Sequence, residues 1–254
     1  TIKWFGWLLL GFAVLLPVMP FSDQKTMDLG VLILTYVMLG WGLNIVVGLA
    51  GLLDLGYVAF YAVGAYAYAL LSTQHGLGFW AVLPLAGMMA ALFGVLLGFP
   101  VLRLRGDYLA IVTLGFGEII RVFMNNLEHP VNITNGPRGL DRIDPMTIGP
   151  QADPWINFGK PLVIGNFSIP SVTLYYYLFL TLVVVSVVIC HRLEQSRIGR
   201  AWMAIREDEI AAKAMGINTR NMKLLAFGMG ATFGGVSGSM FAAFQGFVSP
   251  ESFS

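Results

Sequence analysis

Long apolar runs separated by short polar breaks occupy most of this sequence. Residues 4–20, 29–53 and 55–102 contain no Asp, Glu, Lys or Arg, and a polar stretch at 72–76 divides the longest run. A helix needs about 20 apolar residues to cross the hydrocarbon core of a bilayer. The pattern therefore predicts membrane-spanning helices. We expect seven spans: Trp4–Pro20, Leu29–Leu53, Gly56–Leu71, Phe79–Leu102, Asp107–Asn125, Pro161–Cys190 and Leu224–Phe247.

One segment, residues 191–223, differs from the rest because it is rich in charge. It carries seven Lys or Arg residues and four acids. Short loops with an excess of Lys and Arg lie on the cytoplasmic side of a membrane. Counting the spans back from this loop also places Arg103, Arg105 and Lys3 on the cytoplasmic side. The sequence therefore predicts a cytoplasmic N-terminus and an extracytoplasmic loop at 126–170.

The overall composition points to the same class of protein. Hydrophobic residues make up 57% of the chain and charged residues 11%, whereas soluble domains carry about 25% charged residues. The predicted fold is an all-α, polytopic bundle of transmembrane helices in contact with membrane lipid. A net charge of +1 gives no indication of nucleic-acid binding.

The sequence contains no motif for catalysis, metal binding or nucleotide binding. Cys190 is the single cysteine, which excludes an intrachain disulfide, and the histidines lie more than 50 residues apart. A Gly-x-x-x-x-Gly-Lys-Ser/Thr phosphate loop is missing. We therefore expect no catalytic residue, no metal and no cofactor in this chain. Because the sequence begins with Thr1 and stops at Ser254, we also expect further spans after Ser254.

Two charged residues fall inside a predicted span. With Asp107 at the cytoplasmic start of its helix, a rise of 1.5 Å per residue places Glu118 roughly 16 Å into the membrane, with Arg121 one turn further. A charge at that depth needs a partner or a polar cavity, and it marks a transport path by default. The alternative is a self-neutralising pair that holds two helices together. Asp54, at a break between spans, is a third candidate for the path and is expected at the membrane interface.

Glycines cluster in two apolar regions, around Gly48 and Gly51 and around Gly234. Glycine interrupts or thins helices, and interrupted helices can direct their ends into a substrate path. The alternative is close helix packing of the small-x-x-x-small kind, as in the stretches 230–234 and 234–238. The sequence leaves both interpretations open.

A short helix is expected inside the charged segment. Residues 208–215 are good helix formers with acids at the start, and Gly216 is a typical C-terminal stop. A helix of about two turns is marginal in water unless something packs on it. Its alanines offer a face that a groove in another protein can approach closely. The alternative is a solvated helix that only returns the chain to the bilayer.

Residues 210–216 resemble the Glu-Ala-Ala-x-x-x-Gly loop of permease subunits in bacterial ABC importers, the short helix that docks into the ATP-binding subunit. Ile210 replaces the Glu of that pattern, and Glu209 stands one residue earlier. The resemblance implies that residues 191–223 form a cytoplasmic coupling loop. The coupling residues that it implies are Glu209, Ile210, Ala211, Ala212, Lys213 and Gly216.

Three longer stretches, 107–121, 199–212 and 245–253, resemble the larger permease subunit of branched-chain amino acid ABC importers and its near relatives for urea and short amides. The resemblance implies that residues 1–254 form a single transmembrane permease domain in a bacterial inner membrane. It implies three kinds of partner protein: a second homologous permease subunit, two ATP-binding cassette subunits that hold ATP and magnesium, and a periplasmic amino-acid-binding protein. Its substrates would be Leu, Ile and Val. Import of urea or short amides remains an alternative, as does an ATP-independent transporter or channel.

Overall fold

The chain folds into a helical bundle, as a computed structural model describes for residues 2–19, 22–101, 104, 107–128, 132, 134–148, 154–164 and 167–253. Its α-helices are α1 (Ile2–Leu15), α2 (Gln24–Leu43), α3 (Val58–His75), α4 (Phe79–Val101), α5 (Asp107–Asn126), α6 (Ser171–Glu194), α7 (Arg197–Glu207), α8 (Glu209–Ala214) and α9 (Thr219–Gln245). A π-helix at Asn44–Leu49 extends α2, and 3-10 turns lie at Leu16–Val18, Gly136–Arg138 and Pro250–Phe253. Two antiparallel hairpins stand between α5 and α6: β1 (Thr147–Ile148) with β2 (Ile156–Asn157), and β3 (Leu162–Ile164) with β4 (Phe167–Ile169).

Five of the described helices are long and apolar enough to cross a membrane: Gln24–Leu49, Phe79–Val101, Tyr108–Asn126, Ser171–Glu194 and Thr219–Gln245. This result confirms the predicted all-α, polytopic class. The two other predicted spans correspond to α1, with 14 helical residues, and α3, with 18. Their crossing of the membrane, and the total of seven spans, stay predictions.

Two predicted boundaries differ from the helix ends in the structure. The polar stretch 72–76 was expected to end a span, whereas α3 continues to His75 and is capped by Gly76, which has a φ of +59°. Within this stretch, buried Ser72 donates a hydrogen bond to Asp144 Oδ2 at 3.3 Å. The span predicted to start at Pro161 starts instead at Ser171, since β3 and β4 pair with each other. Arg103 and Arg105, which contributed to the predicted orientation, lie outside the described residues.

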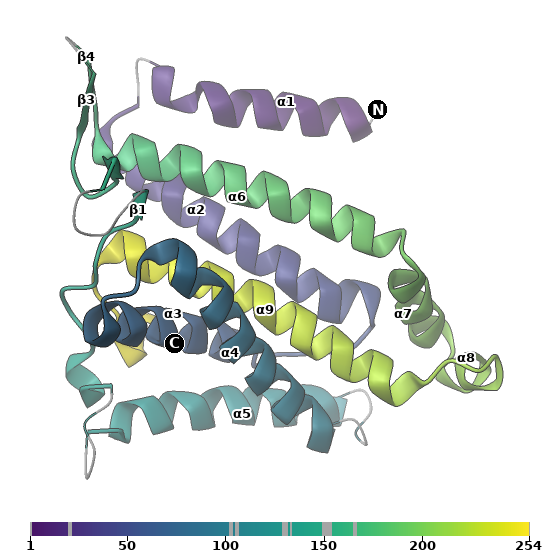
Figure 1. The fold of residues 1–254 in the computed structure, drawn as a ribbon. Helices are drawn as coiled ribbons and strands as arrows, with labels where there is room; N and C mark the ends of the chain where they lie inside the picture. The colour runs from purple at the N-terminus through teal and green to yellow at the C-terminus, as the bar shows by residue number, and fades with distance from the viewer. Residues whose placement is uncertain are drawn as a thin grey trace.

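Helix α9 runs through the middle of the bundle and packs against α2, α3 and α4 (Figure 1). α6 packs on α2, and α5 packs along α3 and α4 on the opposite side. The hairpins lie at one end of the bundle, while α7 and α8 extend from the other end (Figure 1). The first residues of α1 lie toward the end of the bundle that carries α7 and α8 (Figure 1). This arrangement agrees with the prediction that the N-terminus and the charged loop lie on the same side of the membrane.

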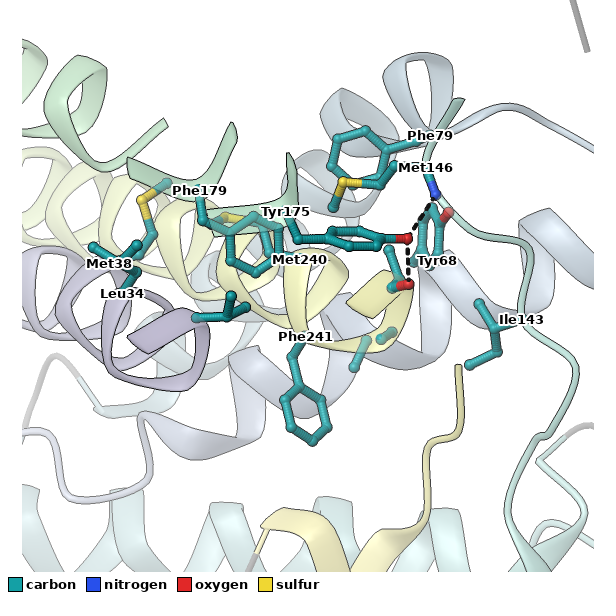
Figure 2. Packing of buried hydrophobic residues seen from close by; sticks show 14 of the residues in the cluster. Leu34, Met38, Tyr68, Phe79, Ile143, Met146, Tyr175, Phe179, Met240 and Phe241 are labelled. Atoms are coloured by element: carbon teal, nitrogen blue, oxygen red, sulfur yellow. Dashed lines mark hydrogen bonds between the residues drawn. The ribbon is translucent and has the colours of Figure 1, made fainter. Parts of the chain in front are cut away.

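The hairpin end of the core is held by tyrosines (Figure 2). The hydroxyl of Tyr175 accepts a hydrogen bond from the Met146 N–H (3.2 Å) and donates one to the Ala243 carbonyl (3.3 Å). Tyr68 donates to the backbone carbonyl of Asp144 at 2.9 Å. These bonds fasten the loop before β1 to α3, α6 and α9, so the loop is part of the core and not a free connection.

Glycines allow α9 to lie against its neighbours. A Cβ atom on Gly235 would stand 2.5 Å from Ala90 Cβ, and one on Gly94 would stand 2.6 Å from Ala231 Cβ. A Cβ atom on Gly234 would stand 3.0 Å from Phe60 Cβ and 3.4 Å from the Tyr57 hydroxyl oxygen. The close packing that the small-residue spacing predicted is therefore present along α9.

Replacing Gly235 by alanine is expected to lower the stability of the folded chain by about 1–3 kcal/mol, because the added methyl group overfills the contact between α9 and α4. Thermal unfolding of the purified chain in detergent measures the change. Gly115→Ala is the matched control, since a Cβ there meets nothing within 4 Å. The control should be neutral or slightly stabilising; equal effects at both positions would contradict the packing argument.

Candidate functional site

The short helix predicted in the charged loop is present as α8. Asp208 caps it, with Oδ1 accepting hydrogen bonds from the N–H groups of Ile210 (2.8 Å) and Ala211 (3.1 Å). Gly216 follows with a φ of +85°, in the left-handed region that glycine favours. These residues explain why a helix of six residues begins and ends at these positions.

Helix α7 precedes α8 and was not predicted. The Ser196 hydroxyl accepts a hydrogen bond from the Gly199 N–H at 3.2 Å, which caps the helix. One side of the helix carries Ile198, Trp202 and Ile205, of which the last two are buried. The signal exists in the sequence, because a Ser followed by apolar residues at this spacing indicates a capped amphipathic helix.

The predicted coupling residues of α8 face in two directions. Ala212 is buried, and Glu209 Oε2 lies 2.8 Å from Lys223 Nζ, so both residues face the bundle. Ile210 and Met215 are 73% and 84% exposed. Also exposed are Ala211, Lys213 and Gly216. The outer side of α8 and its cap therefore presents two large apolar side chains beside Ala211, Lys213 and Gly216, and no part of the chain that the structure describes covers them.

Two contacts fasten α7 and α8 to the beginning of α9. The Lys223 side chain is only 8% exposed and forms the ion pair with Glu209. The indole Nε1 of fully buried Trp202 donates a hydrogen bond to the Met222 carbonyl at 2.7 Å. Since Met222 and Lys223 are adjacent, the charged loop and the central helix are joined at one point.

The chain between the π-helix that extends α2 and the start of α3 is not helical. Residues 50–57 follow the π-helix at the end of α2, and Gly51 has a φ of +68°. The Leu55 N–H donates a hydrogen bond to Thr113 Oγ1 in α5 at 3.0 Å. Residues 50, 52, 54, 56 and 57 of this segment are buried, and non-helical backbone is tolerated within a membrane protein where it is buried in protein.

Asp54, expected at the membrane interface, is buried inside the protein with 3% of its surface exposed. Its Oδ1 accepts a hydrogen bond from the Gly56 N–H at 3.0 Å, which shapes the turn into α3. Its Oδ2 has no hydrogen-bond partner among the described residues. The position of Asp54 at the membrane interface stays a prediction. Its burial was not predicted, because the segment after α2 folds back against α5, a contact that the local sequence does not reveal.

Glu118 and Arg121 form the predicted ion pair. Arg121 Nη2 and Nε both lie 3.0 Å from Glu118 Oε2. The two side chains are 57% and 42% exposed, so the pair faces outward from α5. Both line a cavity of about 150 Å³ between α3, α5 and the turn Pro250–Phe253. The rest of the lining is mostly apolar and includes Leu55, Val58, Ala59, Leu114, Met124 and Phe253.

The structure separates the other path candidates. Gly48 and Gly51 lie beside Arg206 of α7. Gly234 lies in the contact between α3 and α9. Asp54 is next in sequence to Leu55 and Gly56, which line the same cavity as Glu118 and Arg121. The candidates that come together are therefore Glu118, Arg121 and the segment beside Asp54.

The long apolar helices, the central glycine-packed helix and the charged loop define the class as a multi-pass membrane protein with a helical bundle. Residues 26–254 match the family described as the branched-chain amino acid transport system permease component. The chain belongs to this family of transport subunits.

Two relatives are the high-affinity branched-chain amino acid transport system permease proteins LivM of Escherichia coli and Salmonella typhimurium. They are 49% and 48% identical over 96% and 99% of this chain, which spans 59% and 60% of their own lengths. The permease protein LivH of Escherichia coli is 23% identical over 85% of this chain and 69% of its own length. No solved structure shows significant similarity to the chain.

Proposed function

We propose that this chain is a membrane-spanning permease subunit of an ATP-driven importer for Leu, Ile and Val. The observation that carries the proposal is α8, a short helix with an exposed apolar side that is fastened to the central helix through Lys223. A helix of this length would be marginal by itself. An exposed apolar side on a fixed helix is the surface that a partner protein binds.

The proposed partner at α8 is an ATP-binding subunit, which would hold the ATP and magnesium. Ile210 and Met215 would enter its groove, and Ala211 would let the two backbones approach closely. Glu209 and Ala212, implied as docking residues by the family pattern, would act from inside by holding α8 on α9. This division follows from their burial and from the ion pair.

The similarity to two kinds of permease protein supports one further partner, and the others belong to the same proposal. Both LivM and LivH proteins are similar to this chain, which supports an assembly with a second, homologous permease subunit. We propose that two ATP-binding subunits complete the assembly on the cytoplasmic side. A periplasmic binding protein would deliver the amino acid to the extracytoplasmic loop 126–170. The protein would then lie in a bacterial inner membrane with its N-terminus in the cytoplasm.

The cavity beside α5 is the proposed part of the translocation path. Its lining is mostly apolar, which suits aliphatic side chains, and the Glu118–Arg121 pair supplies charges of both signs. An intramembrane ion pair that faces out of its own bundle needs another protein surface or a polar cavity opposite it. We therefore place the second permease subunit across this side of α5.

The docking surface is tested by Ile210→Glu and Met215→Glu in the complete importer, reconstituted in vesicles with its binding protein. Each change places a charge in the proposed apolar contact, and ATP-driven leucine uptake should fall about tenfold or more. Less ATP-binding subunit should also co-purify. Gln195→Glu adds the same charge to the same loop outside α8 and should change neither measurement.

Wild-type uptake and co-purification in both α8 variants would contradict the docking surface. Uptake by this chain in vesicles that lack ATP-binding subunits would instead support an ATP-independent transporter. Competition by urea or acetamide, without competition by leucine, would support the alternative substrate class.

A further inference from the structure

Arg206, in the last turn of α7, makes a contact that leads away from α9. Its Nη1 donates a hydrogen bond to the Gly48 carbonyl, near the end of the π-helix that extends α2. The terminal carbonyls of a helix lack partners within the helix and carry partial negative charge. A guanidinium is therefore a favourable partner at this position.

The stem of Arg206 lies on Gly51. A Cβ atom on Gly51 would stand 2.7 Å from Arg206 Cγ and 3.1 Å from its Cβ, and Gly51 also has a φ of +68°. Both observations explain why glycine is present at this position. Arg206 thus contacts the first turn of the non-helical segment 50–57 with its stem and the preceding helix end with its head group.

The other end of segment 50–57 lies against α5. Leu55 donates to Thr113 Oγ1 at 3.0 Å, and a Cβ on Gly117 would stand 3.3 Å from the Gly56 Cα. Leu55, Gly56 and Gly117 line the cavity that contains the Glu118–Arg121 pair. The segment therefore connects α7 to the cavity over a few residues.

Two polar contacts of α7 and α8 take a different direction. Trp202 bonds to Met222, and Glu209 pairs with Lys223, so both lead into α9. A displacement of α7 and α8 would reach α9 through these contacts as a rigid unit. The stem of Arg206, through its contact with Gly51, instead reaches segment 50–57, which has no helix to hold its shape.

We propose that Arg206 is a positioning residue that transmits movement of α7 and α8 to segment 50–57, and through Leu55 and Gly56 to the wall of the cavity beside α5. The proposal rests on the proposed function, in which an ATP-binding subunit moves α8. In it, Arg206 would couple nucleotide-driven movement to opening or closing of the path, without touching the substrate itself.

The test uses Arg206→Met in the complete importer, with ATP hydrolysis and leucine uptake measured on the same vesicles. Methionine keeps an apolar stem over Gly51 and removes the guanidinium. Stimulated ATP hydrolysis should stay near the wild-type rate, while leucine molecules transported per ATP should fall at least about fivefold, the usual size of a coupling effect. Arg206→Lys, which keeps a cationic donor, should recover part of this ratio.

Arg200→Met is the matched control, because Arg200 also lies in α7 and donates to a backbone carbonyl, that of Gln195 at 2.7 Å, within its own segment. It should leave transport per ATP unchanged. An unchanged ratio in Arg206→Met overturns the proposal, and so does a parallel fall of hydrolysis and uptake, which indicates a purely structural role.

If Arg206→Met does not assemble, Arg206→Gln, which keeps a neutral hydrogen-bond donor, replaces it, and the same quantity is measured: leucine molecules transported per ATP. The proposed function is tested separately by the wild-type vesicles. Wild-type vesicles that show no ATP-driven leucine uptake contradict the importer assignment itself, whereas wild-type uptake with an unaltered Arg206→Met ratio contradicts only the role of Arg206.

Discussion

Glu209→Ala is expected to destabilise the folded chain by about 3 kcal/mol. The change leaves the Lys223 ammonium group without its 2.8 Å partner in a position where its side chain is 8% exposed. Removing one partner of a buried ion pair costs about 3–5 kcal/mol, because an uncompensated charge stays buried. Glu209 itself is 30% exposed, so we expect the lower end of this range. Thermal unfolding in detergent measures the effect on the isolated chain.

The double variant Glu209→Ala with Lys223→Met distinguishes two causes of instability: loss of the ion pair, and burial of an unpaired ammonium group. Methionine replaces the ammonium by an apolar group of similar length, so most of the stability should return. Glu194→Ala is the control, since its pair with His191 is more than half exposed on both sides at 3.9 Å and should contribute less than about 1 kcal/mol. A double variant no more stable than Glu209→Ala would show that the buried charge is not the cause.

Arg121→Gln and Glu118→Gln should each impair the proposed importer strongly. Each change leaves one charge of the pair without its partner, and at the predicted depth in the membrane an isolated charge costs about 2.5–3.5 kcal/mol. The informative variant is the double one, with both residues changed to glutamine. If the pair only neutralises itself, the double variant should transport leucine normally. If the pair belongs to the path, we expect the double variant to fold and assemble while ATP-driven uptake stays reduced about tenfold.

Uptake and the yield of assembled complex, measured together, distinguish these outcomes. Asn126→Ala is the control on the same helix, because Asn126 lies in the last turn of α5, donates to the Val122 carbonyl at 2.7 Å and is not part of the cavity lining. Normal uptake in the double glutamine variant would remove Glu118 and Arg121 from the proposed path.

The charge and hydropathy pattern was sufficient for several elements. α4 covers Phe79–Val101, against a predicted Phe79–Leu102, because both of its ends coincide with changes in polarity. The presence of α8 and its end before Gly216 could likewise be predicted from the sequence, since capping and glycine preferences act within a few residues. The Glu118–Arg121 pair could be predicted because residues three apart share one helix face.

Other features could not be predicted, because their causes lie far away in sequence. The burial of Asp54 depends on the packing of its segment against α5. The hydrogen bond that joins them, from Leu55 to Thr113, links residues 58 positions apart. The inward orientation of Glu209 depends on Lys223 in the next helix. The contact of Arg206 joins residues 158 apart, and the residue types involved are ordinary for a charged loop and a glycine-rich turn.

By itself, the sequence determined that the chain is a bundle of apolar helices with one charged loop and a short helix inside that loop. These properties follow from transfer of side chains between water and lipid and from local backbone preferences, which need no knowledge of the fold. Only the tertiary structure decided which charges face inward, where segment 50–57 lies and which side of α8 is exposed. These properties depend on which distant groups come within bonding distance, and that is set by how the helices pack.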